Sequence, residues 1–133
     1  MNITELSLNH ILGLDTEKVV FSSDLARKCD DAKRKKIKDL SASEIRLLIS
    51  QKIGLKYLIP IAVEILEQDI LIETEYYKGD LAVALFECNV ENLDLDKETK
   101  TKIWEIAIEL NTLSRTISED ILPLLPEAAK LFK

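Results

Sequence analysis

Glycine and proline are scarce in this 133-residue chain, which contains only three of each. So few turn-forming residues are not enough for the many tight turns of a typical all-β domain. Apolar residues make up 47% of the chain, which excludes a disordered protein. Leu, Ile, Glu, Lys and Ala are the dominant residue types in the chain and favour helices. We therefore expect an all-α fold, a compact single-domain bundle of about six or seven helices over residues 1–133.

The residue types that build catalytic and metal sites are also few. His10 is the only histidine, and Cys29 and Cys88 are the only cysteines, without CxxC spacing. The only glycines are at positions 13, 54 and 79, so no stretch of the chain can form a glycine-rich phosphate-binding loop. Carboxylates are abundant, but their spacing assigns no acid or base. We therefore expect a protein that is not an enzyme, with no metal site, no cofactor and reduced, structural cysteines.

Long uncharged stretches are absent as well. No run of 18 residues lacks a charge, so we expect no transmembrane helix and no membrane partner. The first residues, Met1–Glu5, do not form a basic start followed by an apolar stretch, so we expect no signal peptide. Together with reduced cysteines, these features predict a cytoplasmic protein.

Charge is the least evenly distributed property of the chain, whose net charge is −6. Residues 64–96 hold ten acidic residues and one basic residue, Lys78, which gives a net charge of −9. Residues 1–63 carry +3, and residues 97–133 are neutral. An acidic region repels nucleic acid and attracts basic proteins, so we expect a basic protein partner and no nucleic acid.

The basic run Lys33–Lys38 points in another direction. It would suit a small helical nucleic-acid-associated regulator, which is the alternative function. It would equally suit a solvated helix end, where Lys and Arg complement the helix dipole. We favour the helix end, because Asp30, Asp31 and Asp39 dilute the positive charge and no aromatic residues are interleaved.

Apolar spacing and capping residues predict the positions of the helices. Expected features include a cap at Ser22 or Ser23, a capping box formed by Ser41 and Glu44, and a C′ residue at Gly54. Pro60 should lie in the first turn of a helix or kink it. The predicted segments are a helix over 6–12 ending near Gly13, a brief extended piece over 18–21, and helices from the Ser22/Ser23 cap to 36, from the capping box to Gly54, over 55–66 as the central core helix, 81–88, 97–113 and from 118 onward.

The stretch Tyr76–Glu87 allows two interpretations. Gly79 could adopt a positive φ, Asp80 could cap the helix from Leu81, and Tyr76 or Tyr77 could pack on its first turn. Alternatively, tyrosines beside acidic residues are typical of protein interfaces, where the rings give contact area and the charges steer a basic partner.

Two sequence motifs stand out in the middle of the chain. The first comprises Arg46, Leu47, Leu48, Ile49, Gln51, Gly54, Leu55, Tyr57, Leu58, Pro60, Ala62 and Leu66, and the second comprises Tyr76, Tyr77, Gly79, Asp80 and Leu81. With these motifs the chain resembles a bacterial family of immunity proteins from contact-dependent growth inhibition (CDI) systems. The resemblance covers about Leu40–Leu85, with a weaker echo in 7–14 and 25–36, and none from about Val90 onward. Ile70, Lys78 and Ala82 depart from the family pattern.

This resemblance implies a small protein that binds and blocks the toxic C-terminal domain of a cell-surface effector. Such toxins are often nucleases with basic, phosphate-binding clefts, which the acidic region could occupy. Arg46 and Gln51 could satisfy buried partners, such as Asp80, or contact the toxin. The expected toxin-binding residues are Asp69, Glu73, Glu75, Tyr76, Tyr77, Asp80, Glu87, Glu91 and Asp94.

Overall fold

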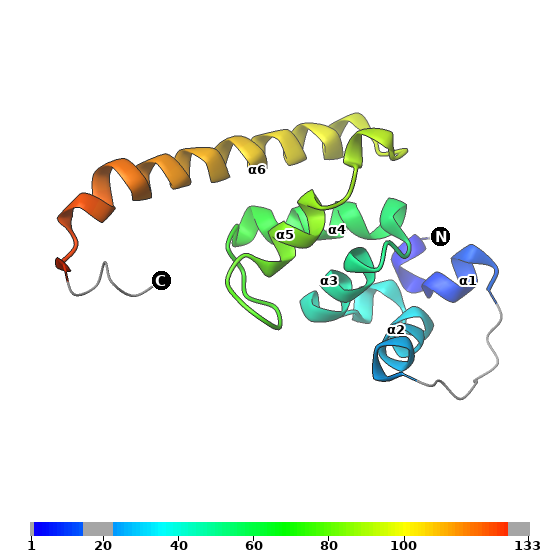
Figure 1. Cartoon of the computed structure of the whole chain (residues 1–133). Helices are drawn as coiled ribbons and strands as arrows, with labels where there is room; N and C mark the ends of the chain where they lie inside the picture. Colours follow the sequence, from blue (N-terminus) through cyan, green and yellow to red (C-terminus); the bar gives the residue numbers. More distant parts are fainter. Residues whose placement is uncertain (1, 15–22, 128–133) are drawn as a thin grey trace. The chain divides into compact units, whose positions relative to one another are not determined.

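A computed structural model of the chain describes residues 2–14 and 23–127. These residues form an all-α fold with six α-helices and no named strand (Figure 1), which confirms the predicted fold class. The extended piece predicted over 18–21 lies outside the described residues. The helices are α1 (Leu8–Leu12), α2 (Asp24–Arg34), α3 (Ala42–Ser50), α4 (Leu55–Gln68), α5 (Asp80–Phe86) and α6 (Lys97–Thr116).

The chain divides into two compact units, Met1–Leu95 and Asp96–Lys133. In the first unit, α3 packs against α2, α4 and α5, whereas α4 packs mainly against α3 and α5. The segment predicted as the central core helix, 55–66, does lie in the core, with five buried residues on α4, but α3 is the helix that packs against three others. Apolar residues at positions i, i+3 and i+4 give α3 a buried face made of Ile45, Leu48 and Ile49. On α4, the buried residues are Leu58, Ile59, Ala62, Val63 and Leu66.

The predicted N-terminal caps of α2 and α3 are confirmed. The Ser23 hydroxyl accepts a hydrogen bond from the Ala26 N–H, and Ser41 forms a complete capping box with Glu44. Helix α2 ends at Arg34 instead of continuing to residue 36, because the backbone becomes extended at Lys35. These local signals therefore predict where helices begin more closely than where they end.

Gly54 does not have the predicted C′ role after α3. Lys52 takes that position with a φ of +58°, and the Ile53 N–H donates to the Leu48 carbonyl as in a Schellman motif. Gly54 is instead the N-cap residue of α4, with a φ of +65°. A Cβ at this glycine would lie 2.7 Å from a methyl carbon of the fully buried Leu8, so both the backbone and the packing require glycine.

Pro60 lies in the second turn of α4, one turn later than the first-turn position considered above. Because proline has no N–H, the carbonyl of Lys56 receives no helical hydrogen bond from this position.

The seventh helix that was predicted from Ser118 is not a separate element. Helix α6 passes directly into a π-helical turn, Ile117–Ile121, and then into a 3₁₀ turn, Leu122–Leu124.

The second unit is formed around α6. Asp96 caps its start by accepting a hydrogen bond of 2.7 Å from the Thr99 N–H. Ile103 and Ile106 are buried, whereas Trp104 and Ile108 are exposed. None of the helices in the described part of the chain is both long enough and apolar enough to cross a membrane.

Candidate functional site

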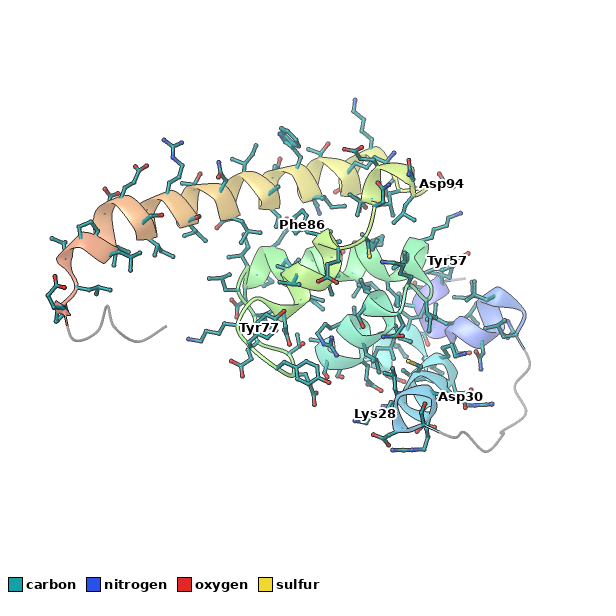
Figure 2. All side chains as sticks on the ribbon, viewed as in Figure 1. Lys28, Asp30, Tyr57, Tyr77, Phe86 and Asp94 are labelled. Atoms are coloured by element: carbon teal, nitrogen blue, oxygen red, sulfur yellow. The ribbon has the colours of Figure 1, made fainter. Side chains whose placement is uncertain are left out.

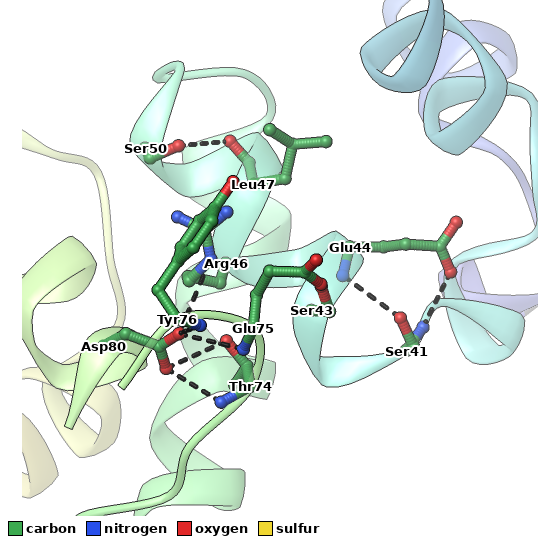
Figure 3. Close-up of polar contacts among 10 residues, drawn as sticks. All are labelled: Ser41, Ser43, Glu44, Arg46, Leu47, Ser50, Thr74, Glu75, Tyr76 and Asp80. Carbon is green, nitrogen blue, oxygen red and sulfur yellow. Dashed lines mark hydrogen bonds and ion pairs between the residues drawn. The ribbon is translucent and has the colours of Figure 1, made fainter. Parts of the chain in front are cut away.

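The Asp80 carboxylate organises the loop that precedes α5 (Figure 3). Its Oδ1 accepts hydrogen bonds from the N–H and the hydroxyl of Thr74, each 2.9 Å long. Its Oδ2 accepts from the N–H groups of Glu75 and Tyr76, each at 3.0 Å. The predicted helix-cap role of Asp80 is wrong, because Gly79 is the N-cap residue and Asp80 is the first residue of α5. The carboxylate satisfies loop donors instead of helix donors.

These hydrogen bonds keep Asp80 ionised although only 3% of the residue is exposed. Burial by itself would raise the pKa of this carboxyl. The N–H groups of Tyr76, Thr74 and Glu75 donate to the charged form and outweigh burial, so the pKa lies well below its usual range. The loop therefore depends on a buried negative charge.

The loop is closed at its base by backbone contacts. Glu73 and Lys78 form an antiparallel bridge, and the Gly79 N–H donates to the carbonyls of Leu71 and Ile72 at 3.1 Å. Gly79 has a φ of +91°, in the left-handed region that residues with a Cβ rarely adopt, which confirms the predicted positive φ. The connection is thus an ordered hairpin-like loop, which we call the Asp80 loop and define as residues 73–78.

Arg46 of α3 lies beneath this loop, with a side chain that is 12% exposed. Its Nε is 4.0 Å from Asp80 Oδ2, which is an ion pair but too long for a hydrogen bond. Its guanidinium carbon lies 4.8 Å from the centre of the Tyr76 ring, within cation–π range. Arg46 therefore sits beside Asp80, as one of the two interpretations proposed. Gln51, by contrast, is the exposed C-cap residue of α3.

The tip of the Asp80 loop carries the exposed groups. Tyr76 is 68% exposed and Tyr77 is 50% exposed. Glu75 is also exposed, and its Oε2 accepts a hydrogen bond of 2.6 Å from the Ser43 hydroxyl on α3. Sequence reasoning missed both Thr74 and Ser43. Thr74 lies only six residues before Asp80, but Ser43 is 32 residues from Glu75 and gives no local signal.

A groove of about 610 Å³ is lined by residues of α2, α3 and this loop. Its walls combine apolar, aromatic and charged side chains from the three elements. The lining residues are Asp24, Leu25, Lys28, Asp31 and Lys35 from α2 and its end, Ser43, Glu44, Arg46 and Leu47 from α3, and Glu75 and Tyr76 from the loop.

The nine predicted binding residues do not form one cluster. Glu73, Glu75, Tyr76, Tyr77 and Asp80 belong to the Asp80 loop or support it, and Asp69 lies at the C-terminal end of α4. The remaining three, Glu87, Glu91 and Asp94, follow α5 at its other end.

The position of Asp94 shows how far the acidic residues after α5 lie from those of the Asp80 loop. It pairs with Lys56 in the first turn of α4, with Oδ2 and Nζ 3.4 Å apart. Since α4 has 14 residues, its two ends are about 21 Å apart. Figure 2 shows Tyr77 and Asp94 well separated in the first unit. The acidic segment therefore presents two separate surfaces.

Most cations of the basic run Lys33–Lys38 form ion pairs with carboxylates of the same chain. Arg34 Nε lies 2.8 Å from Asp30 Oδ2, and Lys35 Nζ lies 2.7 Å from Glu44 Oε2. Lys38 pairs with Glu5 at 2.8 Å. Three of the five cations in this run therefore have carboxylate partners, which reduces the positive charge that the run offers to phosphate groups.

Comparison with known proteins identifies the family. The family model of CDI immunity proteins matches residues 12–103. No curated protein and no solved structure is similar enough to this chain to count as a match. The match covers more than half of the chain, so the chain belongs to the family of CDI immunity proteins. It includes the groove, Arg46 and the whole Asp80 loop, and it extends beyond the resemblance over Leu40–Leu85 in both directions.

Proposed function

We propose that this chain neutralises the toxic C-terminal domain of a CDI effector by binding it stoichiometrically in the cytoplasm, without catalysis. Membership of the immunity family supports the general function. The observation that supports the proposed binding surface is the order of the Asp80 loop. This loop presents two exposed tyrosines and exposed carboxylates, and it is held by a buried charge network. An ordered loop loses little conformational entropy on binding, which favours tight association.

The toxin face that meets this loop is basic in our proposal. Glu73 and Glu75 are exposed, so their charges can steer a basic partner from a distance. Tyr76 or Tyr77 then supplies the aromatic anchor. Asp80 supports the loop without contacting the toxin, because its carboxylate is buried and already holds four hydrogen bonds. A nuclease is the proposed toxin, since its phosphate-binding cleft would offer such a basic face.

The test uses the C-terminal toxin domain of the cognate effector, which would be sought first among the reading frames that neighbour the gene for this chain. We expect co-expression of the present chain to restore growth to cells that produce this domain. Titration calorimetry should give a 1:1 complex, and the chain should block cleavage of plasmid DNA or transfer RNA by the domain. Growth rescue without any complex would contradict neutralisation by binding, and a toxin without nuclease activity would contradict only the finer proposal.

A further inference from the structure

Within the part of the chain that the structure describes, one carboxylate of the groove beside the Asp80 loop, that of Glu75, has no ion-pair partner. Lys28 Nζ pairs with Asp24 at 3.3 Å, and Lys35 pairs with Glu44. Asp31 pairs with Arg27 at 3.5 Å. These pairs leave the α2 side of the groove close to electrical balance.

Glu75 differs from the other carboxylates of the groove. Among the described residues, its carboxylate accepts a hydrogen bond from the neutral Ser43 hydroxyl and forms no ion pair. The lining side chains comprise four carboxylates and three cations, so the surplus negative charge is assigned to Glu75. The groove therefore lacks one positive charge for full compensation.

The surfaces around Glu75 suit a long, planar cation. The guanidinium carbon of Arg46 lies 4.8 Å from the centre of the Tyr76 ring. Tyr76 nevertheless remains 68% exposed, so ring surface is left for a partner. Leu25 is 47% exposed and, with Leu47, adds apolar surface to the groove. An arginine side chain has an apolar stem, a face that stacks on aromatic rings, and a fork of donors that matches a carboxylate.

We infer that this groove binds one arginine side chain projecting from the toxin, with its guanidinium on Glu75 and Tyr76 and its stem on Leu25 and Leu47. The inference rests on the proposed function and deepens it by naming the contact. An anionic group would be repelled by Glu75. An apolar side chain would remove water from the Glu75 carboxylate without replacing its hydrogen bonds. Lysine matches the charge but offers neither the planar face nor the fork.

The test is a double-mutant cycle between this chain and the same effector domain. Glu75→Gln removes the charge and keeps an acceptor for Ser43, and Glu91→Gln is the matched control on the other acidic group. Each surface arginine of the toxin is replaced by Ala and, separately, by Lys. We expect Glu75→Gln to raise the Kd about tenfold or more and to couple with a single toxin arginine by a similar factor. Glu91→Gln should change the Kd less than about twofold.

A second variant tests the groove by filling it. Leu25 is half-exposed in the first turn of α2, so Leu25→Trp should fold normally, occupy the groove and weaken binding at least as strongly as Glu75→Gln. Absence of a complex with the unaltered chain would overturn the proposed function together with this inference. A tight complex in which Glu75→Gln couples to no arginine and Leu25→Trp binds normally would overturn this inference alone. A coupled lysine in place of an arginine would overturn the assignment of the cation.

Discussion

The Arg46 guanidinium and the Asp80 carboxylate form a buried ion pair that is not hydrogen-bonded, with Nε and Oδ2 4.0 Å apart. The Arg46 Nε has no hydrogen-bond partner among the described residues, whereas the Asp80 carboxylate accepts four hydrogen bonds from the loop. Arg46 therefore supplies charge beneath a loop that Asp80 holds by hydrogen bonds. This division of roles links the stability of the first unit to the presentation of Tyr76 and Glu75.

Replacing Asp80 should cost far more than the loss of a helix cap. Asp80→Ala leaves the Thr74, Glu75 and Tyr76 donors unsatisfied and Arg46 without its counter-charge, so we expect the free energy of unfolding to fall by roughly 3–5 kcal/mol. The matched control is Ser41→Ala, which removes a true N-cap and should cost about 0.5–2 kcal/mol. Urea denaturation measures both losses, and equal losses would show that the loop network contributes no more than a single N-cap.

The same carboxylate should make stability depend on acid pH. The pKa of Asp80 is lowered in the folded state, so its contribution is fully present above about pH 3.9, the ordinary value for aspartate, and is lost as pH falls further toward the folded pKa. The unaltered chain should therefore lose unfolding free energy faster than Asp80→Asn as pH falls from about 5 to 2. Denaturant titrations at several pH values give both slopes, and parallel slopes would exclude a lowered pKa.

Two substitutions on α4 should differ in their effect on stability, because one residue is fully buried and the other only partly. Leu58 is 0% exposed, so Leu58→Ala should cost about 2–5 kcal/mol through lost burial and a cavity. Ile65 lies within the segment 55–66 that was predicted as the core helix, but it is only partly buried. Ile65→Ala should therefore cost clearly less, and chemical denaturation of both variants decides the order. A larger loss for Ile65 would contradict the packing of α4 described above.

Gly54 and Gly13 form a matched pair of left-handed glycines. Their φ values are +65° and +66°, so alanine costs about 1–2 kcal/mol of backbone strain at either position. Only at Gly54 does the added Cβ also meet Leu8, at 2.7 Å, while nothing lies within 4 Å at Gly13. We expect Gly54→Ala to lower the melting temperature more than Gly13→Ala. Similar shifts would mean that Leu8 moves aside without loss.

Charged and aromatic residues of the Asp80 loop should affect different rate constants of toxin binding. Reversing Glu73 to Lys should mainly slow association with the toxin domain at low salt, because steering is screened over about 8–10 Å at physiological salt. Tyr76→Ala or Tyr77→Ala should mainly speed dissociation and cost about 2 kcal/mol or more at a true anchor. Stopped-flow binding at two salt concentrations measures both rates, on variants with unchanged melting transitions.

The second acidic group is the control for this kinetic prediction. Reversal of Glu87, Glu91 and Asp94 should have a smaller effect, because these residues lie at the other end of α5 from the Asp80 loop. If neither this reversal nor that of Glu73 alters association, the acidic segment does not steer the toxin. The binding surface would then lie on α2 or on the second unit.

Helix positions follow from the sequence because they depend on neighbours within one or two turns. The capping box at Ser41 and the cap at Ser23 bond to N–H groups three residues away, so a short stretch of sequence contains the whole interaction. The apolar stripe of α3 likewise needs only the helical repeat. The burial of Ile65 could not be predicted in this way, because α4 is apolar on several sides and packing partners decide which side is covered.

The role of Asp80 was decided by tertiary structure. Its sequence position after Gly79 suits a helix cap, and a carboxylate can accept from helix or loop donors with similar energy. Burial of the residue beside Arg46, which lies 34 positions earlier in the chain, favours the arrangement that satisfies the most donors around a charge. The sequence by itself therefore determined the all-α class, the family and the excess of acidic residues. Only folding brought Arg46, Ser43 and α2 to the Asp80 loop, because burial and contacts between distant segments are properties of the packed chain.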